Sequence, residues 1–296
     1  PAALYHKDFA KRISLGNFDD DMHKIKDCDW VLEAVVERLD IKKQVFENVE
    51  KHRTKGTIIS SNTSGIPIHQ MLEDRSEDFQ KHFIGTHFFN PPRYLKLLEI
   101  IPTPKTDQEI TDFLMHYGDL YLGKTTVLCK DTPAFIANRV GIYAILKVVE
   151  SMQKLGMNID EVDKLTGPVI GRPKSATFRT SDVVGLDTLI KVANGLYENL
   201  PNDEARDTFK LPDVIGKLEE NKWLGDKTGQ GFYKKTKKDG KTEILTLDLD
   251  SMDYKPKTKP KFSTLEATKQ ISNLKERFPV LLGGKDKAGE FYRKNF

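Results

Sequence analysis

One histidine and one glutamate stand out because their spacing could bring them together on neighbouring strands. His87 lies twelve positions before Glu99 (87 to 99), and the residues that follow the first and precede the second are apolar types common in buried strands. Between them, Asn90-Pro91-Pro92 ends the first strand. A carboxylate on one ring nitrogen would fix the imidazole tautomer and leave the other nitrogen as a proton acceptor. The spacing alone fits a structural histidine beside an unrelated surface glutamate equally well.

Alternating strand and helix patterns surround this pair. This alternation favours a parallel α/β sheet with helices on its faces. In such sheets ligands bind beyond the carboxyl ends of the strands, where Glu37, Ser64 and Asn90 fall. The predicted strands cover 30–36, 57–61, 82–89, 94–101 and 125–129, and the predicted helices cover 19–26, 41–52, 69–72 and 107–120.

A second, helical region is expected to begin with a long helix. Thr132 is a good N-cap residue and Pro133 a good first helical residue. Only three side chains between residues 134 and 149 are clearly polar, so this helix is expected to be buried nearly all round. One of the three is Asn138, whose buried amide needs a partner. That partner is either a neighbouring backbone group or a polar substrate atom.

The last part of the chain is basic and contains a turn and an extended segment. Asp239-Gly240 predicts a hairpin turn between two short strands. Residues 255–261 alternate lysine with proline and threonine, which is typical of an extended linker. Ser263 and Glu266 form a capping-box pattern that predicts a helix to about residue 278.

Composition excludes several classes of function. The net charge of +3 is small and the lysines are dispersed, so no nucleic-acid partner is expected. Cys28 and Cys129 lack a metal-ligand spacing, and no metal is predicted. No apolar run approaches the roughly 18 residues of a membrane helix. The two cysteines fit a reducing, cytoplasmic location.

Four stretches together resemble the 3-hydroxyacyl-CoA dehydrogenases of fatty-acid β-oxidation. The resemblance covers roughly residues 30 to 235, and the tail is similar to long bacterial members that carry further domains. It implies an incomplete Rossmann-like parallel-sheet NAD-binding domain at 1–130, a helical substrate and dimerisation domain at 131–235, and a basic hairpin, linker and helix at 236–296. The stretches are Ser61 to Ser64, His87 to Pro91 with Leu97 to Glu99, Asp131 to Pro133 with Asn138-Arg139, and Lys227 to Tyr233.

The resemblance also implies a reaction and its residues. The reaction is oxidation of (S)-3-hydroxyacyl-CoA to 3-oxoacyl-CoA, with NAD as cofactor and an acyl-CoA thioester as substrate. His87 would be the general base and Glu99 would orient it. The other implied contacts are with the substrate, through Ser64, Asn90 and Asn138, and with NAD, through Glu37 and Lys42.

Other functions remain open at this stage. A non-catalytic CoA-thioester-binding module, or a structural, crystallin-like relative, would keep the fold without the reaction. A 6-phosphogluconate-type dehydrogenase would need a lysine base, which nothing here supplies. Gly171 to Ser175 departs from the family's usual Met-Gly-Pro turn, which leaves the acyl-chain preference open. Expected partners are a second copy of the chain or further domains of a longer one.

The sequence contains no Gly-x-Gly-x-x-Gly loop, the element that seats the pyrophosphate of NAD in this family. The resemblance places that loop before residue 1. We therefore expect the chain as printed to bind NAD poorly. Isothermal titration of the chain with NAD measures this, and appreciable binding heat would contradict it.

Overall fold

The computed structural model describes residues 4–238 and 240–296. Two compact units divide the chain, Pro1–Asn138 and Arg139–Phe296, and the division falls in the first turn of helix α4 (Ala137–Lys154). The boundaries expected from the sequence at 130 and 235 stay predictions. No helix in the described ranges is long and apolar enough to cross a membrane.

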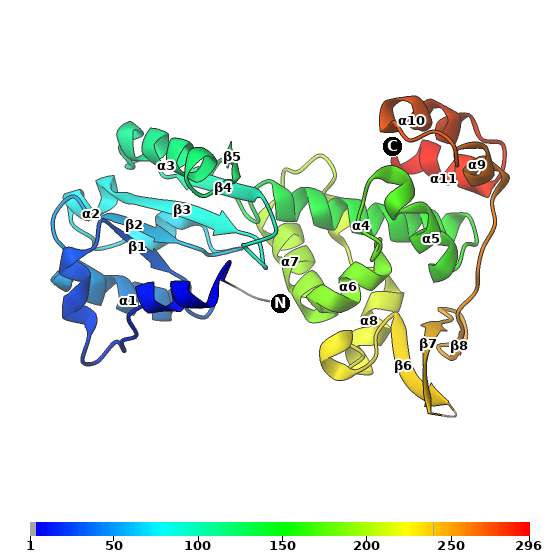
Figure 1. Ribbon diagram of the computed structural model, residues 1–296, viewed down its shortest axis with the longest axis horizontal. Coiled ribbons are helices and arrows are strands. Elements are labelled where there is room, and N and C mark those ends of the chain that lie inside the picture. The colour runs from blue at the N-terminus through cyan, green and yellow to red at the C-terminus, as the bar shows by residue number, and fades with distance from the viewer. Residues whose placement is uncertain (1–3, 239) are drawn as a thin grey trace. The chain divides into compact units, whose positions relative to one another are not determined.

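The first unit contains a five-stranded sheet in the order β1-β2-β3-β4-β5 (Figure 1). All five strands lie where the sequence predicts them, but β1 ends three residues early. It stops at Glu33 because the carboxylate of Glu33 accepts the N–H of Val35 and turns the chain. The strands are β1 (Trp30–Glu33), β2 (Ile58–Ser61), β3 (Phe83–Phe88), β4 (Leu97–Pro102) and β5 (Thr125–Leu128).

One strand pair departs from the predicted parallel arrangement. β3 and β4 are antiparallel, whereas the pairs β1–β2, β2–β3 and β4–β5 are parallel. The connection at 89–96 is too short for the crossover that two parallel neighbours need. The antiparallel register places His87 directly opposite Glu99.

Helices cover both faces of the sheet, with α1 (Leu39–His52) and α3 (Gln108–Leu120) on opposite sides (Figure 1). Phe46 of α1 stacks edge-on against Phe83 of β3. Leu114 of α3 packs in a separate cluster with Ile84 and Ile100. These two apolar layers fix the central strands. The remaining short helices of this unit are η1 (Lys7–Arg12), η2 (Met22–Asp27), η3 (Ile68–Leu72) and α2 (Glu77–Lys81).

The long helix α4 corrects two predictions. It begins at Ala137 and not at Pro133, because Ala134 and Phe135 adopt left-handed backbone angles (φ 60° and 50°) that interrupt a helix. It is also not buried all round, since Val140 is 60% exposed. Its apolar run therefore overstates its burial.

The second unit is mainly helical and includes a small antiparallel sheet, β6-β7-β8. The predicted hairpin joins β6 to β7, although Asp239 of its turn lies outside the described residues. After α4, the elements of the second unit are α5 (Ile159–Leu165), η4 (Pro168–Ile170), α6 (Phe178–Val184), α7 (Leu186–Asn199), η5 (Arg206–Phe209), α8 (Asp213–Glu220), η6 (Asp226–Thr228), β6 (Tyr233–Lys238), β7 (Lys241–Leu247), β8 (Tyr254–Pro256), α9 (Ser263–Ala267), α10 (Leu274–Gly283) and α11 (Lys287–Asn295).

Predictions for the tail need correction. The segment expected to be a linker begins as strand β8, which pairs with β7. The helix expected from Ser263 to about residue 278 is two helices, α9 and α10. Ser263 does not cap α9, because its hydroxyl donates to Asp286 instead. A long-range acceptor has replaced the local capping box.

Asp182 of α6 explains the Gly-Gln-Gly-Phe-Tyr stretch at 229–233. Its two carboxylate oxygens accept the N–H groups of Phe232 and Tyr233, each at 2.8 Å. A Cβ at Gly231 would collide with the same carboxylate, so the chain needs glycine there. Burial raises the pKa of Asp182 to about 6, despite the two hydrogen bonds that favour its ionised form.

This raised pKa makes stability depend on pH with a definite sign. The folded state binds the proton of Asp182 more tightly than the unfolded chain does. The contribution of Asp182 to the free energy of unfolding therefore falls as the pH rises from about 4 to above 6. Relative to Asp182→Asn, we expect the wild type to lose roughly 3 kcal/mol of unfolding free energy as the pH rises from 4 to 7. Urea unfolding followed by Trp223 fluorescence, in a Trp30→Phe background, measures it.

The exposed Asp250 gives the control variant, Asp250→Asn, for which we expect no such shift. A difference between the wild type and Asp182→Asn that stays constant with pH would contradict the prediction.

Candidate active site

His87 and Glu99 form a buried hydrogen-bonded pair between β3 and β4. His87 Nδ1 lies 2.7 Å from Glu99 Oε2, which confirms the predicted contact. Glu99 is fully buried and His87 is 4% exposed. Phe89 and Phe135 flank the imidazole, with ring centroids at 4.4 and 5.7 Å. The pair is therefore held in a dry, apolar setting, where electrostatic contacts are stronger than in water.

The second oxygen of Glu99 binds the start of α4. Oε1 accepts the N–H groups of Ile136 and Ala137 at 3.0 and 2.7 Å. Burial by itself raises the pKa of Glu99, but the hydrogen bonds from His87 and Ala137 outweigh it and leave the pKa below its usual value. Glu99 is thus ionised near neutral pH, and helix donors and the imidazole share its charge.

The ionised carboxylate fixes the tautomer of the imidazole. Because an ionised carboxylate only accepts hydrogen bonds, Nδ1 of His87 is the donor toward Glu99. In the neutral ring Nε2 is then the acceptor. That nitrogen faces Ser64, whose hydroxyl lies 3.1 Å away. His87 therefore presents a basic nitrogen toward the carboxyl ends of β2 and β3.

The other predicted substrate residues lie at different distances from this nitrogen. Asn138 Nδ2 is 3.5 Å from the carbonyl oxygen of Ser64, a long contact that leaves most of its amide unengaged. Asn90 is exposed, and no hydrogen bond in the described part of the chain joins it to these residues. The structure therefore brings Ser64, His87, Glu99 and Asn138 together, and within the described residues Asn90 makes no hydrogen bond to them.

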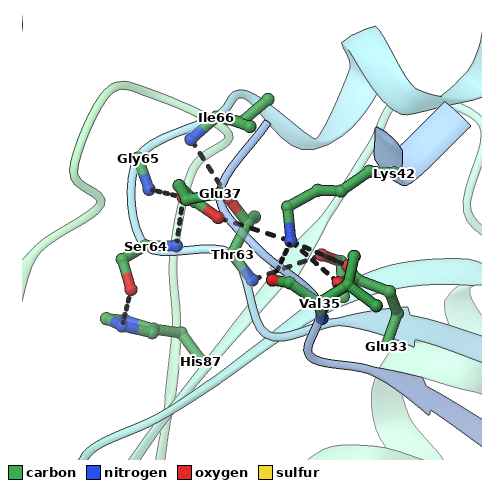
Figure 2. Close-up of polar contacts among 10 residues, drawn as sticks. Glu33, Val35, Glu37, Lys42, Thr63, Ser64, Gly65, Ile66 and His87 are labelled. Carbon is green, nitrogen blue, oxygen red and sulfur yellow. Dashed lines mark hydrogen bonds and ion pairs between the residues drawn. The ribbon is translucent and has the colours of Figure 1, made fainter. Parts of the chain in front are cut away.

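Glu37 accepts hydrogen bonds from the turn that carries Ser64, as Figure 2 shows. Its Oε1 accepts three hydrogen bonds, from Thr63 Oγ1 at 2.6 Å and from the N–H groups of Ser64 and Gly65 at 2.9 Å each. Burial by itself raises the pKa of Glu37. The hydrogen bonds from Thr63 and Ser64 and the charge of Lys42 outweigh burial and leave the pKa below its usual value, so Glu37 stays ionised.

Lys42 lies beneath this turn, enclosed by protein oxygens (Figure 2). Its Nζ is 2.8 and 3.0 Å from the two oxygens of Glu33, 3.4 Å from the carbonyl of Val35, and 3.3 Å from Glu37 Oε2. The side chains of Lys42 and Glu33 are each 1% exposed. Sequence reasoning missed Glu33, although a carboxylate inside the apolar run from Trp30 to Val36 signals a buried ionic partner.

The geometry of Ser64, His87 and Glu99 fits two kinds of chemistry. In the first, His87 removes a proton from a substrate hydroxyl. In the second, Ser64 itself is the activated nucleophile of an acyl transfer. Acyl transfer also needs free N–H donors for an oxyanion, and the nearest candidates, those of Ser64 and Gly65, already donate to Glu37. The site therefore favours proton abstraction by His87.

Two further features limit the chemistry. Across the residues that the structure describes, no group of three or more His, Cys, Asp or Glu side chains could hold a metal ion. Cys129 is buried near Glu99, and burial together with that negative charge raises the pKa of its thiol to about 12. It is therefore no nucleophile near neutral pH.

Family models match most of the chain. The model described as "3-hydroxyacyl-CoA dehydrogenase, NAD binding domain" matches residues 2–132. The model described as "3-hydroxyacyl-CoA dehydrogenase, C-terminal domain" matches residues 135–235. Glu37, Ser64, His87 and Glu99 fall within the first match, and Asn138 falls within the second.

Two curated bacterial proteins are 50% identical to the chain. A probable 3-hydroxyacyl-CoA dehydrogenase of Bacillus subtilis aligns over 289 residues, which are 98% of this chain and 36% of that protein. A probable 3-hydroxyacyl-CoA dehydrogenase of Deinococcus radiodurans aligns over 237 residues, which are 80% of this chain and 68% of that protein. The chain thus spans about a third of the first relative and two thirds of the second.

A solved structure has a similar fold. The crystal structure of 3-hydroxybutyryl-CoA dehydrogenase from Escherichia coli superimposes with a TM-score of 0.65 at 27% identity. The superposition covers 71% of this chain and 43% of the other.

The two-sided use of the Glu99 carboxylate predicts a pH-dependent loss of stability. Glu99→Gln supplies one acceptor oxygen where two are needed, so we expect it to lower the unfolding free energy by roughly 1–3 kcal/mol near neutral pH. Because the folded pKa of Glu99 is below its ordinary 4.5, the wild-type advantage exists above that pH and is lost as the pH falls through the folded pKa. Urea unfolding followed by Trp30 fluorescence, in a Trp223→Phe background, tests this.

The exposed Glu219 supplies the control variant, Glu219→Gln, for which no comparable change is expected. If the wild type exceeds Glu99→Gln in unfolding free energy by the same amount at pH 3 as at neutral pH, the ionised form of Glu99 is not the cause of the difference.

Proposed function

Since the chain belongs to the 3-hydroxyacyl-CoA dehydrogenase family, we propose that the protein oxidises (S)-3-hydroxyacyl-CoA to 3-oxoacyl-CoA with His87 as the general base. The observation that carries this proposal is the ordered series Ser64, His87 and Glu99, in which the imidazole nitrogen that faces Ser64 is an acceptor. An alcohol oxidation needs such a base near the hydroxyl proton.

The roles of His87 and Glu99 follow from their contacts. Nε2 of His87 accepts the proton of the substrate's 3-hydroxyl, and the imidazole becomes positively charged. The charge of Glu99, 2.7 Å from Nδ1, stabilises that imidazolium and holds the ring in place. NAD, the cofactor of the family's N-terminal domain, would supply the acceptor for the hydride that leaves the same carbon.

Three polar side chains are proposed to bind the substrate. The Ser64 hydroxyl, 3.1 Å from Nε2, lies where it can share the substrate hydroxyl with His87. The Asn138 amide, with only its long contact to Ser64, is available to hydrogen-bond a hydroxyl or thioester carbonyl. Asn90 is exposed beyond β3, and its proposed contact is with a more distant part of the acyl-CoA.

The cofactor-facing residues fit NAD to different degrees. The side chain of Glu37 is 30% exposed, and among the described residues its Oε2 contacts Lys42 alone, so it fits a hydroxyl donor of the cofactor's ribose. The ammonium of Lys42 is enclosed by protein oxygens, so a direct contact would require that side chain to move. No residue of the printed chain is assigned to the pyrophosphate, because the glycine-rich motif is absent from the sequence.

The wider context is part of the proposal. We place the reaction in fatty-acid β-oxidation, which the resemblance to that group of dehydrogenases supports. Association with a second copy of the chain, or with further domains of a longer protein, stays a prediction, as do the cytoplasmic location and the weak NAD binding of the printed chain.

The test is NADH-dependent reduction of acetoacetyl-CoA by the protein at its full natural length, followed at the nicotinamide absorbance. We expect activity in the wild type and a loss of about 10²- to 10⁴-fold in kcat for His87→Ala, the usual contribution of a positioned base. His116→Ala removes an exposed histidine of α3 and should leave the rate unchanged. Full activity in His87→Ala would remove His87 from the mechanism.

A silent but folded wild type would contradict the dehydrogenase proposal itself. It would favour instead a CoA-thioester-binding or structural protein of the same fold.

A further inference from the structure

The turn at 63–65 is held by two carboxylates that one lysine joins. Glu37 accepts three donors from the turn through its Oε1. Glu33 holds Ser61, two residues before the turn, because Ser61 donates its hydroxyl to Glu33 at 2.5 Å and accepts the N–H of Thr63. Both carboxylates contact the ammonium of Lys42 (Figure 2). The backbone around Ser64 therefore depends on a single cation.

The charge balance of this network is asymmetric. Within its described residues Lys42 is the sole cation, and it faces two carboxylates. Without it, two negative charges would face each other in a nearly dry space, which is unfavourable. Glu33 is fully enclosed, whereas Glu37 is 30% exposed and is the one that can turn toward water. If Glu37 turned, the turn at 63–65 would lose its common acceptor.

We propose that Lys42 is a positioning residue, which holds Glu37 in place beneath the 63–65 turn and thereby sets the Ser64 hydroxyl on His87 Nε2. The effect passes from the Lys42 ammonium to Glu37, from Glu37 to the N–H groups of the turn, and from Ser64 to the imidazole. The proposed positioning of Ser64 and His87 depends on these contacts alone. Only the expected effect on the reaction rate rests on the proposed function.

Figure 2 makes the order of these contacts visible, with Lys42 and His87 on opposite sides of the turn. Lys42 therefore acts without touching the imidazole. A positioning role of this kind predicts a larger change in the rate of the chemical step than in substrate binding, because the other proposed substrate contacts remain while the geometry of Ser64 and His87 is lost.

The test compares the ring ¹⁵N resonances of His87 in Lys42→Met with those in Ser64→Ala. Ser64→Ala removes the contact to Nε2 directly, so we expect Lys42→Met to shift the Nε2 resonance in the same direction. In steady-state assays of acetoacetyl-CoA reduction, Lys42→Met should lower kcat by about 10- to 100-fold with KM within about twofold, the scale expected for misplacement of a reacting group.

Three further variants separate positioning from loss of folding. Lys43→Met removes the neighbouring lysine, which pairs with Glu73 outside the network, and should leave both readouts unchanged. Glu33→Gln combined with Lys42→Met removes one charge of each sign, leaves Glu37 with its three donors, and should restore the His87 resonance and much of kcat. Glu37→Ala combined with Lys42→Met removes the common acceptor of the turn and should restore neither readout.

A folded Lys42→Met with wild-type His87 resonances would overturn the proposal. So would a failure of the Glu33→Gln and Lys42→Met combination to restore them in a folded protein. If Lys42→Met does not fold, Glu37→Ala decides, since it keeps the Lys42–Glu33 pair but removes the acceptor through which Lys42 acts on the turn, and unchanged His87 resonances in it would overturn the proposal. The expected resonance shifts in a protein without dehydrogenase activity would support the positioning role and reject the proposed reaction.

Discussion

The hydrogen bonds of the Glu99 carboxylate are the interaction on which the rest of the site depends. A fully buried carboxylate is costly unless each oxygen is satisfied. One oxygen binds His87 across the β3–β4 pair, and the other accepts two N–H groups at the start of α4. The same charge thus fixes the imidazole tautomer and the point at which the helix begins. Moving the helix start would leave either the helix donors or the carboxylate without partners, which explains why Ala134 and Phe135 tolerate left-handed backbone angles.

His87 is held from two sides by separate carboxylate systems. Glu99 fixes Nδ1, while Glu37 acts on the turn whose Ser64 hydroxyl faces Nε2. An ionised carboxylate suits both tasks because it only accepts, so it collects several donors without a choice of orientation. The imidazole is left with one acceptor nitrogen in a defined direction. Such preorganisation is what a general base requires, because no reorientation is then needed during the reaction.

The short polar stretch from Ser61 to Ser64 connects these systems. Each of its four side chains has a different long-range partner. Asn62 ties the ends of two strands together by accepting the N–H of Phe88. In chain order the four partners are Glu33, the N–H of Phe88, Glu37 and His87.

The sequence by itself determined the approximate positions of the five strands, because apolar runs are broken by stretches such as Asn90-Pro91-Pro92. It made a contact between His87 and Glu99 possible, but the antiparallel register of β3 and β4 decided it, and that register was not predicted. The sequence also indicated the family, through motifs in a fixed order. Only the tertiary structure decided where α4 begins, since the local signal of Thr132 and Pro133 competed with a distant acceptor. The burial of Lys42 was equally invisible, because a lysine on an amphipathic helix is normally solvated and only the fold brings Glu33 to meet it. Local patterns fix local structure, whereas charges find partners through contacts between residues distant in the chain.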